Sequence, residues 1–244
     1  MTDAPRDDDA VFELRRYTLK PGMRETLISV FDTHLVETQE AAGMSVACQF
    51  RDLAAPDQFV WFRGFADHER RNRALPAFYG GPVWAEHGPA ANENMLAWDD
   101  VLLLKPARPE AGFGAGRSKR PPAGTPDPGT GAGTVFLLTL HHLQPDTPDE
   151  HAASLAAAVA EAARVAGGDV LASLVTDRSE NGFPRLPVRE GECVAVTLVR
   201  PRDTDDQAAL EAALRAFPAA LAATQAGRAP ELVRLVPTAR SLLR

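Results

Sequence analysis

The sequence predicts an α+β protein in which a βαββαβ unit occurs twice along one chain of 244 residues. Two observations support this fold class. The same succession of strand-like and helix-like segments appears before and after the middle of the chain. A segment rich in Pro and Gly separates the two occurrences. The length of the chain suits two domains of about 100–150 residues each.

The first half contains the segments of the unit in order. Residues 11–19 (VFELRRYTL) alternate as in a strand, and residues 21–43 carry apolar residues at helical spacing up to Gly43, a candidate helix C-cap. Asp67 is a candidate N-cap for the second helix of this half. The remaining expected elements are strands at 44–53, 58–67 and 101–105 and a helix at 68–75.

The second half repeats this order. An Ala-rich segment at 148–167 predicts a helix that ends in Gly-Gly, and the acidic start of 203–224 favours a helix N-terminus through the helix dipole. The expected strands are 134–143, 169–177, 193–201 and 231–239, with a loop at 178–192.

Residues 106–133 form the boundary between the halves. Thirteen of these 28 residues are Pro or Gly, and Phe113 is their one large apolar residue. Such a segment buries too little surface to offset the ~1–2 kcal/mol that ordering the backbone of each residue costs. We therefore predict a Pro/Gly-rich linker at 108–133 between domains at 1–107 and 134–244.

A βαββαβ unit has a ferredoxin-like arrangement, in which the helices cover one face of a four-stranded sheet and leave the other bare. A bare apolar face drives association. Two tandem ferredoxin-like units can pack their bare faces together, which predicts a pseudo-dimeric α/β barrel within a single polypeptide. Further assembly into a homo-oligomer is compatible with the sequence.

Composition excludes several classes of partner. The formal charge is −7 and no basic run dominates, which argues against nucleic acid and anionic membranes. No apolar run reaches the ~18 residues of a membrane span. Cys48 and Cys193 are the two cysteines, so we expect no disulfide framework and a cytoplasmic protein. The bias toward Ala, Arg, Pro and Gly is typical of a GC-rich genome.

Several segments resemble proteins of the NIPSNAP family, which belongs to the dimeric α/β-barrel superfamily. The resemblance is carried by FELRRYTLKPG, FVWFRGFAD, FYGGPVWAEHGPAAN, DDVLLLKP and the C-terminal LVPTARSLLR, densely in the first half and thinly in the second. It implies the fold expected above. The superfamily includes cofactor-free monooxygenases of antibiotic biosynthesis, haem-degrading enzymes, lactone isomerases and members with no known reaction, so the resemblance leaves the activity open.

The first strand carries an unusual set of polar residues. Glu13, Arg15 and Tyr17 share one face, because successive side chains of a strand point to opposite sides. Burying a carboxylate and a guanidinium on one face is costly unless they pair. One interpretation is a structural Glu–Arg pair that locks the centre of the barrel. The other is a ligand site in which Arg15 binds an enolate or carboxylate and Tyr17 donates a hydrogen bond.

Two histidines and an asparagine are further candidates. His34 lies on the apolar stripe of the first helix, either as a core residue or as a general base, since imidazole titrates close to neutral pH. The Gly-Pro pair that follows His87 is expected to break the helix there, which makes His87 a half-exposed helix end or a base. A new turn starting at Pro89 would direct Asn92 and Met95 inward, where Asn92 could hold an oxyanion or cap a backbone group.

Aromatic residues concentrate in the same half. All three tryptophans fall between residues 61 and 98. About half of these aromatic residues are expected in the core, and the rest would suit a flat hydrophobic ligand. The candidate substrate-binding residues are Trp61, Phe65, Phe78, Tyr79, Trp84 and Met95.

Motifs for common cofactors are missing from the sequence, which contains no G-x-G-x-x-G after a strand, no P-loop, no G-x-S-x-G and no C-x-x-C-H. His34 with Glu37, and His141 with His142, lack a convincing third metal ligand, and adjacent strand residues point to opposite faces. We therefore expect neither a dedicated cofactor nor a metal.

These observations predict an enzyme of secondary metabolism that acts on an aromatic or polyketide-like molecule by proton abstraction, rearrangement or oxygenation. His34 or His87 would be the base, and Arg15, Tyr17 and Asn92 would stabilise the oxyanion. The alternative is a non-catalytic NIPSNAP-like module that binds a hydrophobic metabolite or a protein partner.

Overall fold

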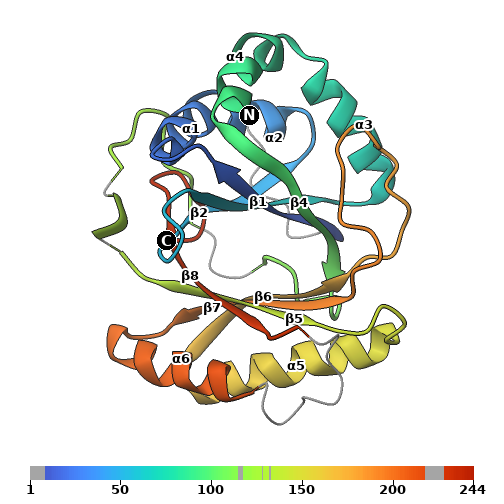
Figure 1. Cartoon of the computed structure of the whole chain (residues 1–244), viewed down its shortest axis with the longest axis vertical. Coiled ribbons are helices and arrows are strands. Elements are labelled where there is room, and N and C mark those ends of the chain that lie inside the picture. Colours follow the sequence, from blue (N-terminus) through green and yellow to red (C-terminus); the bar gives the residue numbers. More distant parts are fainter. Residues whose placement is uncertain (1–8, 115–117, 128, 132, 218–227) are drawn as a thin grey trace.

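The computed structural model describes residues 9–114, 118–127, 129–131, 133–217 and 228–244. Its strands form one closed barrel with the order β1-β3-β2-β8-β5-β7-β6-β4. Helices α1 to α4 lie on one side of the barrel and α5 and α6 on the opposite side (Figure 1). The predicted pseudo-dimeric α/β barrel of two ferredoxin-like units is confirmed.

The elements follow the predicted order twice. The strands are β1 (Val11–Leu19), β2 (Ser45–Asp52), β3 (Gln58–Phe65), β4 (Met95–Pro106), β5 (Phe136–His142), β6 (Gly168–Thr176), β7 (Val194–Pro201) and β8 (Glu231–Pro237). The helices are α1 (Arg24–Val30), the π-helical turn η1 (Phe31–Leu35), α2 (Val36–Ala41), α3 (His68–Tyr79), α4 (Pro82–Glu93), α5 (Asp149–Val165) and α6 (Gln207–Ala216), with 3-10 turns η2 (Gly129–Gly131) and η3 (Thr204–Asp206). The helix expected at 203–224 extends into 218–227, which lie outside the described residues.

Each half supplies four neighbouring strands, and two antiparallel seams join the halves. The β2–β8 seam runs from Phe50 opposite Pro237, and the β4–β6 seam runs from Leu104 opposite Thr176. Each seam contains three paired positions, whereas β1 and β3 pair over eight. Contact between the halves therefore closes the barrel, as expected for two units that pack their bare faces together.

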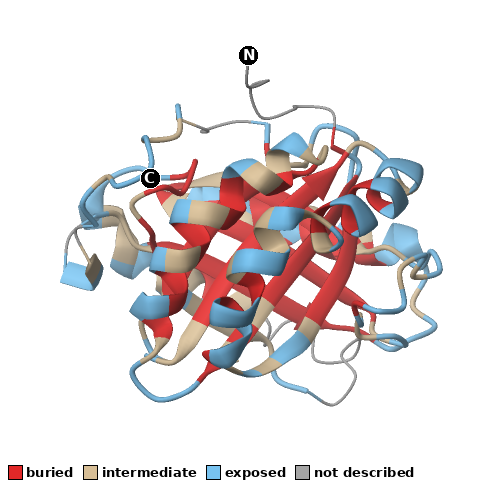
Figure 2. Ribbon diagram, turned by 90° about the horizontal axis from the view of Figure 1, so that it is seen from above, coloured by how far each residue is buried: buried red, intermediate tan, exposed pale blue. Residues whose placement is uncertain are grey.

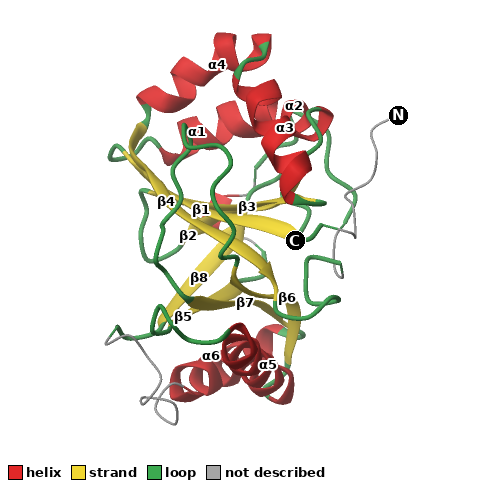
Figure 3. Cartoon of the chain, turned by 90° about the vertical axis from the view of Figure 1, so that its right-hand side faces the viewer, coloured by secondary structure: helices red, strands yellow, loops and turns green. Residues whose placement is uncertain are grey.

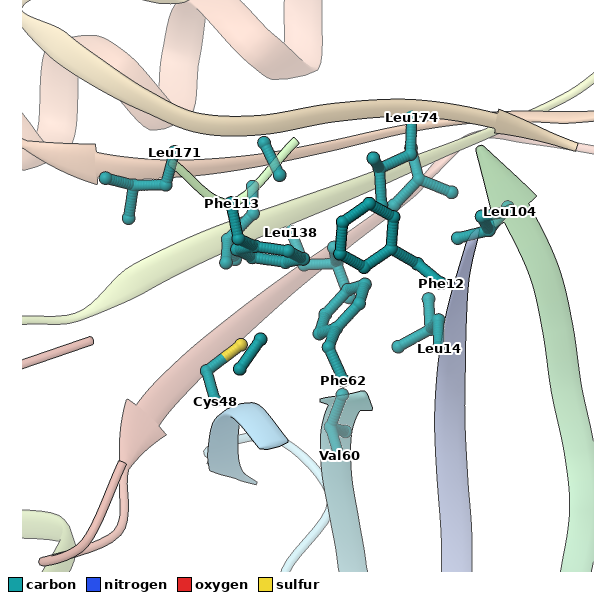
Figure 4. Packing of buried hydrophobic residues seen from close by; sticks show 14 of the residues in the cluster. Phe12, Leu14, Cys48, Val60, Phe62, Leu104, Phe113, Leu138, Leu171 and Leu174 are labelled. Atoms are coloured by element: carbon teal, nitrogen blue, oxygen red, sulfur yellow. The ribbon is translucent and has the colours of Figure 1, made fainter. Parts of the chain in front are cut away.

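The interior of the barrel is an apolar core drawn from both halves. Phe12 and Phe62 of the first half meet Leu138 and Leu171 of the second (Figure 4). Phe113, from the segment between the halves, lies in this core with 1% of its surface exposed. Its ring centroid is 5.5 Å from that of Phe12 and 5.0 Å from that of Phe62. The expectation that this segment buries almost nothing is therefore wrong at Phe113.

Other residues of the segment contact both halves. Arg120 donates hydrogen bonds to the carbonyl oxygens of Val46 at 2.7 Å and Arg240 at 2.6 Å. Asp127 pairs with Arg51 of β2 at 2.8 Å. The division of the chain into two domains and a linker stays a prediction. Parts of the predicted linker lie outside the described residues, at 115–117, 128 and 132.

The barrel lies between two helical layers. Figure 3 shows α1 to α4 on one side of the strands and α5 and α6 on the other. Buried residues concentrate on the strands, and the outward faces of the helices are largely exposed (Figure 2). Within the described part of the chain, no helix has both the length and the apolar character needed to cross a membrane.

The two predicted helices of the first half both form, and the first of them is divided. The helix expected at 21–43 is divided into α1, η1 and α2, and π-helical turns of this kind are frequent at functional sites. Asp67 caps α3 as predicted, because its side chain accepts a hydrogen bond from the backbone N–H of Arg70 at 2.6 Å.

Helix α4 is continuous through Gly88 and Pro89, so the expected break at this pair is wrong. The glycine has a different purpose. A Cβ at position 88 would lie 2.7 Å from the indole ring of Trp84, so Gly88 makes room for Trp84 to fold over the helix.

Candidate functional site

The helix-facing side of the first sheet carries a buried ionic group, here called the arginine cluster. Glu13 on β1 contacts Arg15 of the same strand, Arg63 of β3 and Arg71 of α3, each through a nitrogen–oxygen distance of 2.7–2.8 Å. Arg63 lies directly opposite Glu13 in the ladder between β1 and β3. None of these four residues is exposed to solvent.

The arginine cluster lies between the sheet and the helices. Phe12 and Leu14 pack inside the barrel, whereas Tyr17 packs with the apolar residues of the helical layer. Glu13 and Arg15 share the side of Tyr17, as strand alternation predicts. The predicted pairing of Glu13 with Arg15 is therefore confirmed, and its predicted location at the centre of the barrel is wrong.

The arginine cluster holds more positive than negative charge. Burial raises the pKa of Glu13, but the charges of Arg63, Arg15 and Arg71 outweigh burial and hold that pKa far below its usual range. Three guanidinium groups and one carboxylate thus leave a formal excess of positive charge in a site closed to water. Among the described residues, Nη2 of Arg15 has no hydrogen-bond partner. A second anion is the chemical complement of such a site.

Aromatic residues surround the arginine cluster. Nε of Arg15 donates to the Tyr17 hydroxyl oxygen at 2.9 Å, which leaves the Tyr17 hydroxyl proton for another acceptor. The guanidinium carbons of Arg15 and Arg63 lie 5.7 and 5.4 Å from the ring centre of Trp61. Tyr79 accepts a hydrogen bond from Arg63 at 3.4 Å. Arg15, Tyr17, Trp61 and Tyr79, all predicted site residues, are therefore brought together.

The other predicted aromatic residues lie next to those that surround the arginine cluster, and together they form what we call the aromatic wall. The ring centre of Phe65 lies 5.7 and 6.0 Å from two guanidinium carbons of the arginine cluster. Phe78, Tyr79 and Trp84 form one group with ring centroids 4.7–5.4 Å apart. Met95 packs against the same apolar residues. All six predicted substrate-binding residues therefore lie on the helix side of the first sheet.

The two candidate bases stack on one another. The rings of His34, from η1, and His87, from α4, have centroids 3.7 Å apart and planes 14° apart. Both residues are partly exposed. Imidazole is the side chain that most often serves as a general base, so the stack places both candidate bases at one point of the helical layer.

Asn92 is not part of this arrangement. It lies on the exposed side of α4, so its expected inward orientation is wrong. The expectation assumed a new turn at Pro89, and the continuous helix rotates the residue outward instead. The neighbouring Asn94 is the buried one, and its side chain donates to the carbonyl oxygen of Ala90 at 2.6 Å.

Three residues of the site were not predicted from the sequence. Arg63 stands in FVWFRGF as a single charge among aromatic residues, which is a usable signal for a buried cation. Arg71 stands in HERRNR, a pattern typical of a solvated helix. Asn181 belongs to the second half, and its side-chain oxygen accepts hydrogen bonds from both Nη atoms of Arg71 at 3.1 Å.

Several solved structures match this chain over nearly the whole length of both chains. A candidate monooxygenase from Lactobacillus acidophilus is 9% identical, with 94% of each chain covered and a TM-score of 0.54. One from Fusobacterium nucleatum is also 9% identical, with 94% of this chain and 92% of that chain covered and a TM-score of 0.56. An anthrone oxidase-like protein is 15% identical, with coverages of 95% and 92% and a TM-score of 0.53. These likenesses show the fold.

NIPSNAP-family proteins are also among the similar structures. One of unknown function from Agrobacterium tumefaciens is 20% identical and covers 43% of this chain and 96% of its own, with a TM-score of 0.39. No protein-family model matches the sequence, and no curated protein matches it.

Proposed function

We propose that the first half is the active unit of a monooxygenase-like enzyme that acts on a small aromatic or polyketide-like molecule. The observation that carries this proposal is the arginine cluster, which combines excess positive charge, an unpaired Nη2 on Arg15 and a wall of aromatic rings. Positive charge that is preorganised where an oxyanion develops lowers the energy of an enolate or phenolate relative to its neutral acid.

The site residues divide into a proton acceptor and a holder of the anion. His34, stacked on His87, would remove a proton from the substrate. Arg15 and Tyr17 would hold the resulting oxyanion, and Trp61 would contact the aromatic body. The enolate can rearrange, or it can give an electron to dioxygen, because an enolate is itself an electron donor. The two radicals then combine into a peroxide, and loss of water after protonation leaves a ketone, so one oxygen atom enters the product and the other leaves as water. The likeness to candidate monooxygenases and to an anthrone oxidase-like protein motivates dioxygen as the co-reactant.

Dioxygen uptake tests this proposal. Wild-type protein is mixed with a panel of anthrones and hydroxynaphthalenes, and dioxygen consumption is followed with an electrode. We expect uptake by the wild type and a loss of about 10²–10³-fold in Arg15→Met, the effect of removing one oxyanion donor. Arg73→Met is the matched control, since Arg73 is exposed on α3. Uptake equal to that of buffer for the whole panel would contradict the proposal.

A non-catalytic module for a hydrophobic metabolite is the second candidate. It is favoured by the aromatic and apolar residues that pack together on the helix side of the first sheet. A planar apolar probe that quenches tryptophan fluorescence without dioxygen uptake would support it. We expect Trp84→Phe combined with His87→Ala to abolish the quenching and leave the melting temperature within a few degrees of the wild type.

A further inference from the structure

The loop between β6 and β7, residues 177–193, belongs to the second half and lies over the first. We call it the crossing loop. In Figure 1 it is the orange segment that reaches α3. Asp177 pairs with His68 of α3 at 2.8 Å, and the backbone N–H groups of Asp177 and Arg189 donate to carbonyl oxygens of β4 at 2.9 and 2.8 Å. Both ends of the crossing loop are thus held on the first half.

Asn181 is the loop residue that reaches the arginine cluster. While Nε of Arg71 donates to Glu13, both Nη atoms of Arg71 donate to the side-chain oxygen of Asn181. The side-chain nitrogen of Asn181 donates to the carbonyl oxygen of Leu186 at 2.9 Å. Two N–H groups on one side of a guanidinium match a carboxylate in geometry and charge. Asn181 fills this place with a single neutral oxygen.

A cavity of about 320 Å³ lies beside this contact, between β4 and the crossing loop. Asn181 and Leu103 both line it, and Leu103 lies opposite Glu13 in the ladder between β1 and β4. The cavity therefore borders the arginine cluster, and its volume suits a small ligand. Carboxylates of the loop, including Glu180 and Glu192, also line the cavity. Two arginines line it as well, but Arg178 already pairs with Asp149, and Arg189 already pairs with Asp100 and Glu192. Arg71 is therefore the cation beside the cavity whose Nη atoms face a neutral group.

The crossing loop also completes the aromatic wall. The ring of Phe183 stacks on Tyr79, with centroids 6.2 Å apart and planes 15° apart. Leu186 is buried among the apolar residues of the helical layer. The second half thus supplies apolar contacts as well as Asn181 to a site whose charges all come from the first half.

We propose that the crossing loop is a gate over the arginine cluster, and that Asn181 holds the position on Arg71 that the carboxylate of an aromatic acid takes when it binds. This rests on the proposed function in that the acid is the substrate of that site. The gate narrows the substrate class to aromatic molecules with an acidic group within reach of Arg71. Neutral aromatics of the same size lack the ion pair with Arg71 and bind weakly.

Calorimetric titration of the full chain with benzoate and with benzamide tests this proposal, because the two probes share size and shape and differ in charge. We expect the wild type to prefer benzoate. Asn181→Ala removes the competitor on Arg71 and is expected to tighten benzoate binding about tenfold. Asn181→Asp puts a carboxylate on Arg71 and is expected to weaken benzoate binding by at least as much. Binding of benzamide should change little in either variant.

The control is Arg185→Gln, which removes an exposed positive charge from the same loop. Arg185→Gln and Asn181→Asp each make the crossing loop more negative by one charge. A similar loss of benzoate affinity in both variants would show that net charge alone explains the loss, and it would overturn the gate. Equal affinity for benzoate in the wild type and both Asn181 variants would also overturn it. If a variant does not fold, a shift of the Arg71 Nε–H resonance with benzoate but not benzamide supports the gate, and its absence opposes it.

This binding test is separate from turnover. Dioxygen uptake with neutral substrates and no preference for benzoate would overturn the gate and leave the proposed enzyme standing. A strong preference for benzoate without uptake would leave the gate standing and remove the enzyme.

Discussion

The first strands of the two halves, β1 and β5, are equivalent in the fold, but their helix-facing sides carry different types of residue. Residues 11–19 read VFELRRYTL, and residues 135–143 read VFLLTLHHL. Glu13 pairs with Arg63 across its ladder, and at the corresponding place Leu137 pairs with Val199. The helix-facing residues are Glu13, Arg15 and Tyr17 in the first half and Leu137, Thr139 and His141 in the second. All of them are buried.

The difference shows that the fold does not need the arginine cluster. The second half builds a sheet of the same kind with its own helical cover, and its residues at these positions, Leu137, Thr139 and His141, include neither a carboxylate nor a guanidinium. Replacing a buried ionic group by well-packed apolar residues is often neutral or stabilising. A buried ionic group that is present in one half and absent from the same positions of the other is therefore better explained by binding or catalysis than by stability.

Replacing Glu13 with Leu, the residue type of the second half, is expected to have the largest effect on stability. It leaves three buried guanidinium groups without their common carboxylate, and breaking a buried ion pair costs about 3–5 kcal/mol. Urea unfolding at neutral pH measures the loss. A free energy of unfolding within about 1 kcal/mol of the wild type, as at an ordinary surface position, would contradict the prediction.

A compensated variant sharpens this test. Glu13→Leu combined with Arg15→Thr and Arg63→Val gives the first half three residues of the second. We expect it to recover most of the stability lost in the single variant, because two of the three guanidinium groups that Glu13 neutralises are then gone. We also expect it to lose the ability to bind an anion.

His141 provides the next largest effect, and it depends on pH. Among the described residues, neither of its ring nitrogens has a hydrogen-bond partner. Burial, assisted by His142, lowers the pKa of His141 from 6.5 to about 4. The unfolded chain therefore takes up a proton near pH 6.5 that the folded protein accepts only near pH 4. Stability is lost as the pH falls through this window, by about 3 kcal/mol in total.

His141→Leu removes this dependence. The gap in unfolding free energy between the variant and the wild type should therefore widen in favour of the variant as the pH drops from 7 toward 4. His151→Gln is the control, since His151 is exposed on α5. A gap that stays constant with pH would show that His141 titrates normally in the folded state.

The stacked histidines give the smallest expected effect on stability. His34→Gln changes a partly exposed side chain, so we expect a loss of about 1 kcal/mol or less by thermal unfolding. The effect on turnover is expected to be far larger, about 10²–10⁴-fold for a general base. Full dioxygen uptake in this variant would exclude His34 as the base and point to His87.

The fold could be predicted because its signals are local and occur twice. Strand alternation, the Asp67 cap and the Pro/Gly-rich centre are each visible in a few consecutive residues. β4 begins at Met95, earlier than expected, because its first part lies at the surface with Leu96 and Trp98 exposed and does not read as a buried strand. The burial of Phe113 was missed because one aromatic ring in a Gly-rich segment carries no periodic pattern.

The site could be predicted only in part. Alternation shows that Glu13 and Arg15 share a face, but both faces of β1 are buried, so the pattern cannot tell which one meets the helices. Arg71 and Asn181 come from a charged helix and a polar loop, and only the tertiary fold brings them to Glu13. No local signal in the sequence connects a loop of the second half with a strand of the first.

The closure of this barrel within one chain has a consequence for symmetry. In a barrel built from two identical subunits, the two-fold axis copies every substitution, so a charged site on one sheet must appear on the other. A covalent pair of unequal halves is free of that copying. One barrel then offers one site of this kind. Binding at this site cannot be cooperative with binding at an equivalent site in the same barrel, because the other half does not repeat it.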